Sequence, residues 1–350
     1  MNILELNFER TWRGGERQTL YNMQGFRNSG YNVYLLCYKG SPLEIKALAE
    51  GFKTFGFKNI FGAFFFLLFN SRKYNILHAQ SSHMLTYAVL AKKFHGNKII
   101  FTRRVINIPK GRFTKWKYLL ADSIIAISPA IKKVIENFVQ KEVTVISDIV
   151  EEKKSSIKNG EKLISDLHLK SDTLILGTTA ALTKEKGPFV MIEAIHELAS
   201  KSKNFVFLHF GIGDLEQEMR ELIRKYNLEH VYYLMGFVEN VQDVFSILNI
   251  FVMSSEFEGL GSSVLDAFIY KIPVVSTNAG GLAELLADGR GILCEKNSPR
   301  LLASGIEELF LNPGIIATIT QNAFFYVKKF HSLEFITKQY NDLIESLLIQ

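Results

Sequence analysis

Residues 251–286 read FVMSSEFEGLGSSVLDAFIYKIPVVSTNAGGLAELL and contain two strand-to-helix transitions in close succession. In the first, the β-branched run Ile250–Met253 ends at a polar loop with a Gly-x-Gly turn (Gly259, Gly261). An apolar periodic segment then opens at Ser262. This order predicts a strand, a loop and a helix, so that free backbone N–H groups and the positive end of a helix dipole meet at the turn.

Two carboxylates lie close to this turn. Glu258 precedes it, and Asp266 follows eight residues later, about two helical turns further along. Both side chains can therefore border one ligand, with the helix N-terminus cradling phosphate and a carboxylate holding hydroxyl groups. The residues expected to bind this ligand are Glu258, Gly259, Leu260, Gly261, Ser262, Ser263 and Asp266.

The second transition repeats the pattern. Ile272–Ser276 is typical of a short buried strand, and Gly280-Gly281 begins another helix with Glu284 in its first turn. Neighbouring parallel strands deliver such glycine-rich helix starts to the same edge of a sheet, which is where open parallel sheets bind ligands. The stretch predicts a nucleotide-type site.

The segment from Glu258 to Asp266 resembles the Glu-x7-Glu signature of the retaining GT-B glycosyltransferases, family 4 in particular. Pro273–Thr277 and the following Gly280-Gly281-x-x-Glu284 fit the same family. One departure is Asp266, which is a methylene shorter than the usual Glu. The resemblance implies an α/β fold of two Rossmann-like parallel-sheet domains that face each other across a cleft, with a C-terminal helix that crosses back to the first domain.

Length and composition agree with two domains. The chain has 350 residues, 47% of them hydrophobic, enough for two cores. Its longest apolar run, 60–69, is too short to span a membrane, and the start lacks a signal-peptide pattern, so we expect a cytoplasmic chain. The predicted parts are an acceptor-side domain over 1–150, a linker over 151–172, a nucleotide-sugar-binding domain over 173–330 and a crossover helix over 331–350.

Cysteine and acidic motifs give no sign of a metal or a cofactor. Cys37 and Cys294 sit far apart in separate apolar segments, so we expect two buried core thiols. There is no Asp-x-Asp motif in a supporting context. We therefore expect no metal and no cofactor, with the nucleotide-sugar as a substrate and protein cations and dipoles balancing its charge.

A second loop that resembles the family contains Lys186, the main candidate cation. Residues 180–187, AALTKEKG, are similar to the family's Gly-Arg-Leu-x-x-x-Lys-Gly loop, whose two cations grip the diphosphate. Lys186 is retained, but Ala181 stands at the arginine position. Leaving-group stabilisation must then depend on Lys186, on helix N-termini or on Lys184. By the same resemblance, Gly236-Phe237 would lie beside the base.

The first domain supplies further candidates. A glycine pair, Gly14-Gly15, precedes a predicted helix and resembles the family's N-terminal glycine loop, which faces the donor phosphates and the acceptor. The resemblance implies that the pair binds the donor, and a plain turn is the alternative.

His78 is a candidate catalytic residue because it stands where family members often carry His-x-His, but Gln80 replaces the second histidine. A structural histidine is the alternative, and His83 competes for any functional role. Arg103 and Arg104 end a strand and could contact the acceptor or a phosphate; the alternative is a solvated pair beside a loop.

Charge is divided unevenly along the chain. Residues 1–150 hold 22 Lys and Arg against 9 Asp and Glu, and Gly51–Ala121 holds 13 basic residues and no acidic one. This predicts an anionic partner. A membrane surface at the inner face of the cytoplasmic membrane, a soluble phosphorylated acceptor and the acidic second half are the alternatives. The phenylalanine-rich stretch Phe61–Phe69 favours core over a membrane wedge.

These motifs together predict a retaining, metal-independent glycosyltransferase. The resemblance implies transfer from a nucleotide-diphosphate sugar to a saccharide or lipid-linked acceptor, in bacterial cell-envelope polysaccharide or lipopolysaccharide synthesis. Lys186 would stabilise the leaving diphosphate, Glu258 would hold sugar hydroxyls and Asp266 the ribose. A GT-B nucleotide-sugar 2-epimerase is the alternative. A nucleic-acid-binding module is disfavoured because no recognition motif appears and the second half is acidic.

Overall fold

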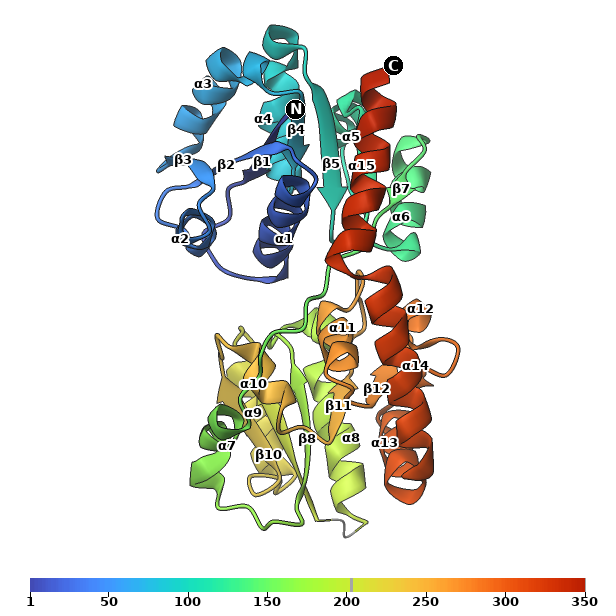
Figure 1. Ribbon diagram of the computed structural model, residues 1–350. Coiled ribbons are helices and arrows are strands. Elements are labelled where there is room, and N and C mark those ends of the chain that lie inside the picture. The colour runs from blue at the N-terminus through green and yellow to red at the C-terminus, as the bar shows by residue number, and fades with distance from the viewer. Residues whose placement is uncertain (202–203, 350) are drawn as a thin grey trace. The chain divides into compact units, whose positions relative to one another are not determined.

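The computed structural model describes residues 1–201 and 204–349 (Figure 1). Residues 202 and 203 of the predicted second domain and residue 350 of the predicted last helix lie outside the described residues. The chain divides into two compact units, one made of Met1–Ile149 with the chain from Phe330 on, the other of Val150–Lys329. Within the described residues, none of the helices combines the length and the apolarity that crossing a bilayer requires.

The first unit is built on a parallel sheet in the order β3-β2-β1-β4-β5-β6-β7. Its strands are β1 (Asn2–Asn7), β2 (Asn32–Tyr38), β3 (Lys53–Phe57), β4 (Ile76–Ala79), β5 (Lys98–Arg103), β6 (Ser123–Ala126) and β7 (Thr144–Val145). Its helices are α1 (Gly14–Asn28), α2 (Pro42–Ala49), α3 (Ile60–Asn70), α4 (Ser82–His95), α5 (Arg112–Leu120), α6 (Pro129–Val139) and α15 (Leu333–Ile349).

Strand β7 is only two residues long. The backbone of Ile149 leaves the sheet because it pairs with a side chain instead: its N–H donates to Gln18 Oε1 (2.7 Å), and its carbonyl accepts from Gln18 Nε2 (2.8 Å). A glutamine on α1 therefore replaces a strand neighbour at this point.

The last helix completes the core of the first unit. Ile336, Tyr340 and Ile344 of α15 are buried in the same cluster as residues of α1 and β1. The rings of Tyr340 and Phe26 meet edge to face with centroids 5.5 Å apart. The chain thus returns to its first domain, as the resemblance implied.

The second unit repeats the architecture with a parallel sheet in the order β10-β9-β8-β11-β12-β13. Its strands are β8 (Leu174–Thr179), β9 (Phe205–Phe210), β10 (Tyr232–Gly236), β11 (Ile250–Met253), β12 (Val274–Thr277) and β13 (Ile292–Cys294). Its helices are α7 (Ile157–Ile164), α8 (Pro188–Ala199), α9 (Glu216–Lys225), α10 (Val241–Phe245), α11 (Ser262–Ile269), α12 (Leu282–Leu286), α13 (Pro299–Leu311) and α14 (Gly314–Phe330).

The predicted linker over 151–172 contains a helix, α7, that belongs to the second unit. Ser156 caps it, and the Ser156 N–H donates to Asp243 Oδ1 (2.7 Å). A Cβ on Gly160 would lie 2.6 Å from the Asp243 carbonyl oxygen. This polar segment packs closely on the second unit through the Ser156 contacts and the close approach at Gly160, and not through buried apolar side chains.

Helix α3 differs from the core that its phenylalanines predicted. Ala63 and Leu67 are fully buried, but Phe61, Phe65 and Phe69 are 71%, 55% and 76% exposed. Aromatic residues occupy several faces of this helix, whereas one helix can turn only one face toward a sheet. The core interpretation is wrong for these three rings.

Both cysteines are buried and reduced, as predicted. Burial raises the pKa of the Cys37 thiol, and it raises the pKa of Cys294 to about 11.

Candidate functional site

The glycine loops that follow β11 and β12 touch each other through their backbones. A Cβ on Gly281 would lie 2.7 Å from the Gly259 carbonyl oxygen, and one on Gly261, whose φ is +100°, would lie 2.5 Å from Leu282 Cδ2. The backbone contact at Gly281 and the positive φ at Gly261 both favour glycine. The glycines therefore position the start of α11 against the start of α12.

Helix α11 presents its N-terminus next to β8. The Ser263 hydroxyl donates to the Thr179 carbonyl at the end of that strand (3.0 Å). The amides of Ser262 and Ser263 head the helix, where no carbonyl of a preceding turn pairs with them. Asp266, one turn along, is 9% exposed. The predicted phosphate cradle and one predicted carboxylate thus lie on the same helix.

The loop with Lys186 is attached to the loop that follows β11. Its short 3-10 helix, η3 (Lys184–Lys186), is followed by Gly187 with φ +58°. A Cβ there would lie 2.2 Å from the Ser254 carbonyl oxygen. The Ser254 hydroxyl donates to the Lys186 carbonyl (2.9 Å), and the Glu256 N–H donates to the Glu185 carbonyl (2.9 Å).

These contacts bring together the two leading candidates of the sequence. Lys186 Nζ lies 2.5 Å from Glu258 Oε2, and the side chains are 26% and 13% exposed. The pair is therefore close enough for a strong charge-assisted hydrogen bond and still reachable from solvent. An ammonium, a carboxylate and a helix N-terminus converge here.

The turn after β9 lies against the same loop. A Cβ on Gly213 would lie 2.4 Å from the Leu182 carbonyl oxygen, and the Leu182 N–H donates to the Ile212 carbonyl (3.1 Å). Ala181 is exposed, so this position of the loop presents no cation. Gly236, with φ +72°, ends the edge strand β10, and the Phe237 ring beyond it is 60% exposed.

A buried histidine beneath this loop was not identified from the sequence. His209 Nε2 lies 3.1 Å from the Ala180 carbonyl, and Nδ1 lies 2.8 Å from the Tyr232 hydroxyl. A neutral ring satisfies both contacts by donating to the carbonyl and accepting from the hydroxyl. Burial lowers the pKa of His209 to about 4. The sequence did contain a signal for it, because His209 is the single polar residue of the apolar run Phe205–Phe210.

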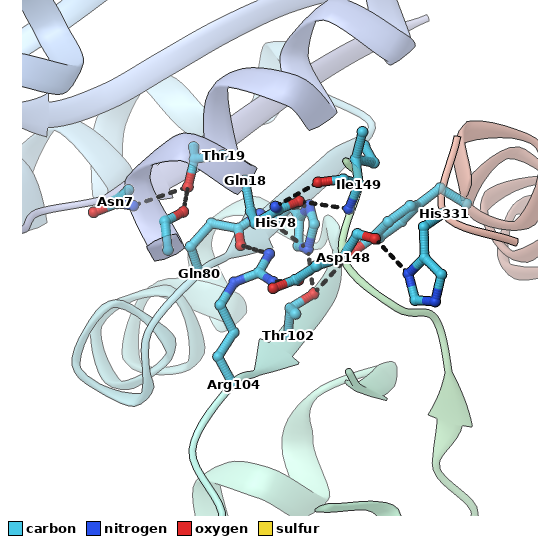
Figure 2. A network of polar contacts seen from close by, with 12 residues as sticks. Asn7, Gln18, Thr19, His78, Gln80, Thr102, Arg104, Asp148, Ile149 and His331 are labelled. Atoms are coloured by element: carbon cyan, nitrogen blue, oxygen red, sulfur yellow. Dashed lines mark hydrogen bonds and ion pairs between the residues drawn. The ribbon is translucent and has the colours of Figure 1, made fainter. Parts of the chain in front are cut away.

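The first unit contains a polar network that connects several elements (Figure 2). His78 Nδ1 lies 2.8 Å from Glu5 Oε1, and His78 Nε2 lies 2.8 Å from the Thr102 hydroxyl. The Thr102 hydroxyl in turn lies 3.3 Å from the Tyr340 hydroxyl on α15. Gln80 Nε2 donates to the second oxygen of Glu5 (2.7 Å).

The network continues to a second carboxylate. Arg104 donates to Gln80 Oε1 (3.1 Å) and forms an ion pair with Asp148. The Asp148 carbonyl lies 3.0 Å from Nδ1 of His331, between α14 and α15 (Figure 2). The network thus contains two carboxylates, Glu5 and Asp148, and the Arg104 Nε is a buried donor without a hydrogen-bond partner among the described residues.

His78 lies inside this network and is 1% exposed. Both of its ring nitrogens have partners, which favours the structural alternative for this residue. The two arginines separate. Arg103 turns inward, with contacts to the Tyr118 hydroxyl (2.6 Å) and Asn107. Arg104 lies beside the predicted glycine loop, since a Cβ on Gly15 would be 3.8 Å from Arg104 Cδ.

The glycine pair takes the position that the sequence predicted. Helix α1 begins at Gly14, and the Gly15 carbonyl accepts from the Thr19 hydroxyl (2.9 Å). The structure therefore places Arg104 and the N-terminus of α1 together in the first unit. In the part of the chain that the structure describes, no three His, Cys, Asp or Glu side chains gather as a metal site would require.

Two sequence families cover most of the chain. Residues 12–153 match "Glycosyltransferase Family 4", and residues 159–324 match "Glycosyl transferases group 1". The chain belongs to glycosyltransferase family 4. Its two parallel-sheet Rossmann-like units are those of the GT-B fold.

Individual relatives agree with this assignment. The chain is 30% identical over 180 residues to the putative colanic acid biosynthesis glycosyltransferase WcaL of Escherichia coli, covering 49% of this chain and 44% of WcaL. It is 29% identical over 168 residues to the uncharacterized glycosyltransferase MJ1059 of Methanocaldococcus jannaschii, covering 47% and 41%. The match thus spans about half the length of these curated relatives.

The fold itself recurs in solved structures. The Anabaena protein HepE in complex with UDP-glucose superposes with a TM-score of 0.85 at 17% identity, covering 99% of this chain and 100% of HepE. At this identity the likeness concerns the fold alone.

Three residues of the network around His78 were not identified from the sequence. Glu5, Asp148 and Tyr340 carry the network around His78. A usable signal existed for Glu5, because it is a single carboxylate within the otherwise apolar run Ile3–Leu6, and a buried carboxylate requires a partner. In the sheet, Glu5 stands directly opposite His78.

Proposed function

We propose that this glycosyltransferase moves a sugar from a nucleoside-diphosphate sugar to a saccharide or lipid-linked acceptor with retention of the anomeric configuration. The observation that carries the proposal is the Lys186–Glu258 pair, with 2.5 Å between Nζ and Oε2, beside the start of α11. Anions are stabilised at such a helix start. The Lys186 ammonium adds to the positive potential at the start of α11.

Each group of the second unit has a role in this proposal. Lys186 and the amides at Ser262 and Ser263 stabilise the charge that builds on the departing diphosphate. Glu258 accepts hydrogen bonds from sugar hydroxyls, and Asp266 binds the ribose. Phe237, exposed after β10, offers an apolar surface to the base. No metal is required, because fixed protein charges supply the stabilisation.

In the first unit, Arg104, which is ion-paired with Asp148, and the N-terminus of α1 form a position suited to a phosphate of the donor or the acceptor. Ala181 removes one cation from the usual loop. Lys186 therefore carries a larger share of the leaving-group stabilisation than in a site with two cations.

The test is a screen of nucleotide sugars by thermal shift, followed by product analysis. A UDP-sugar is the first donor to try, since HepE was solved with UDP-glucose, and oligosaccharides of cell-envelope polysaccharides are the first acceptors, given the colanic acid relative. A bound donor raises the melting temperature, and at a given concentration the shift grows with the logarithm of its affinity. Mass spectrometry and NMR of the anomeric proton then identify the product. Conversion of the donor to its C2 epimer without transfer would support the 2-epimerase, and an inverted linkage would contradict retention.

A further inference from the structure

Helix α3 carries an exposed aromatic stripe that sugar transfer does not explain. Phe61, Phe65 and Phe69 recur every fourth residue, so they lie along one face, and they are 71%, 55% and 76% exposed. The rings of Phe65 and Phe69 stack with centroids 6.4 Å apart. Ala63 and Leu67, which anchor the helix to the unit, are fully buried. An exposed apolar patch of this kind marks an interaction surface.

Cations flank this stripe at both ends of the helix. The helix itself contains no charged residue. Lys58 precedes it, Arg72 and Lys73 follow it, and all three are exposed. They belong to the 71-residue stretch Gly51–Ala121 that has 13 basic and no acidic residues. An apolar stripe with cations at its ends complements an anionic lipid surface, whereas a second copy of the same face would be repelled.

A hollow at the N-terminal end of α3 continues this surface. It encloses about 650 Å³, and its walls include Arg10, Arg13 and Lys58. Glu9 is the one carboxylate among the described residues that line it, so cations outnumber acids. Phe61 lines the hollow and also begins the stripe. An anionic headgroup held there would have its acyl chains beside the exposed rings.

We propose that the protein docks on an anionic membrane through α3. Phe61, Phe65 and Phe69 enter the boundary between headgroups and acyl chains. Lys58 and Arg72 contact lipid phosphates, and the hollow receives a headgroup of the same bilayer. This inference does not depend on the donor or on the reaction that the second unit performs. Apolar burial and cation pairing are each weak alone, and together they hold a peripheral protein at the surface.

The test is sedimentation of the full chain with vesicles at low and high salt. Vesicles of phosphatidylglycerol and phosphatidylcholine should bind it at low salt, and vesicles of phosphatidylcholine alone should not. The double variant Phe65→Ser/Phe69→Ser should lower partitioning by about tenfold or more, since two apolar rings no longer leave water. Phe325→Ser on α14, a ring that is 60% exposed in the second unit, is the matched control and should leave binding unchanged.

The charged part of the surface is tested separately. Lys58→Gln/Arg72→Gln should lower partitioning by roughly tenfold and weaken its salt dependence, whereas Arg300→Gln, an exposed cation on α13, should not. Melting temperatures of all variants establish that they fold. Phe65→Trp, which keeps an apolar ring, should retain binding, and brominated lipids should quench the added fluorescence more than that of Phe325→Trp.

Three outcomes would overturn the proposal. The first is a wild-type protein that ignores anionic vesicles at low salt. The second is a Phe65→Ser/Phe69→Ser variant that folds and binds like the wild type. The third is a wild-type dimer in sedimentation velocity that this variant abolishes, which would make a second copy the partner of the stripe. Sugar transfer to a soluble acceptor can persist in all three cases, so this failure is distinguishable from failure of the proposed reaction.

Discussion

Charged side chains lie on or next to the central strands in both units, but their surroundings differ. In the first unit, Glu5 and His78 are almost completely buried, and each has its partners inside the protein. In the second unit, Lys186 and Glu258 pair at 2.5 Å and remain 26% and 13% exposed. A charged residue on or just after a central strand of a parallel sheet is therefore a candidate for chemistry only when its partners leave it accessible to a ligand.

The sharpest test of this contrast is Lys186→Ala. Removing a fixed charge that stabilises the leaving group should lower turnover by about 10²- to 10³-fold. Lys184→Ala is the matched control, because this exposed lysine lies in the same short helix and should change turnover by less than about tenfold. Steady-state kinetics with the donor found in the screen measures both. Near-normal turnover of Lys186→Ala would remove this residue from the mechanism.

Acid should destabilise the protein through His209. Burial lowers the pKa of this ring to about 4, from its usual value of 6.5. Between these values the unfolded chain binds a proton that the folded chain does not, so the free energy of unfolding falls as pH falls through 6.5 toward 4. The contribution is fully present above this window, and its loss is on the order of 3 kcal/mol.

Urea denaturation across this pH range measures the effect. His209→Gln should flatten the dependence, because glutamine does not titrate. Burial also lowers the pKa of His95, but that histidine is present in both proteins and cancels in the comparison. An unchanged slope in the variant would show that His209 does not govern the acid response.

His78→Gln tests the buried Glu5–His78 pair of the first unit. Glutamine cannot replace both ring contacts, so we expect the free energy of unfolding to fall by about 1–3 kcal/mol. Turnover per folded molecule should stay within about threefold of the wild type, since the group is 1% exposed. Urea denaturation and kinetics on the same preparation give both values. A 10²-fold loss of turnover at unchanged stability would instead restore the catalytic prediction for His78.

The smallest expected effect concerns Asp266. Asp266→Asn should weaken donor binding by about tenfold and leave turnover nearly unchanged, because a ribose contact is present in both the ground and the transition state. Isothermal titration calorimetry gives the affinity. Glu258→Gln is the contrasting variant and should lower turnover more than affinity. The opposite pattern would exchange the roles of the two carboxylates.

The sequence was most informative where backbone geometry controls the structure. Gly259, Gly261 and Gly281 could be placed because their spacing after β-branched runs is typical of strand-loop-helix units, and the close approaches confirm why glycine is needed there. Lys186 could be placed because the pair Lys186-Gly187 ends a loop motif that resembles the family's. These features depend on residues near in sequence.

The remaining features depend on partners distant in sequence. Arg103 and Arg104 are adjacent, yet one turns toward Tyr118 and the other toward Asp148. Alternation at the end of a strand predicts opposite faces for two adjacent side chains, but not the distant partner that each one meets. The exposure of Phe61, Phe65 and Phe69 was missed for the same reason, since periodicity identifies the faces of a helix but not which of them the rest of the fold covers.

Helix α15 also sets an order of events during synthesis. The second unit is one continuous stretch, Val150–Lys329, whereas the core of the first unit includes Ile336, Tyr340 and Ile344. During translation, the apolar surface that α15 covers in the first unit therefore stays exposed until the second unit, and then α15 itself, have been synthesised. The unit that is translated first is the one that is finished last.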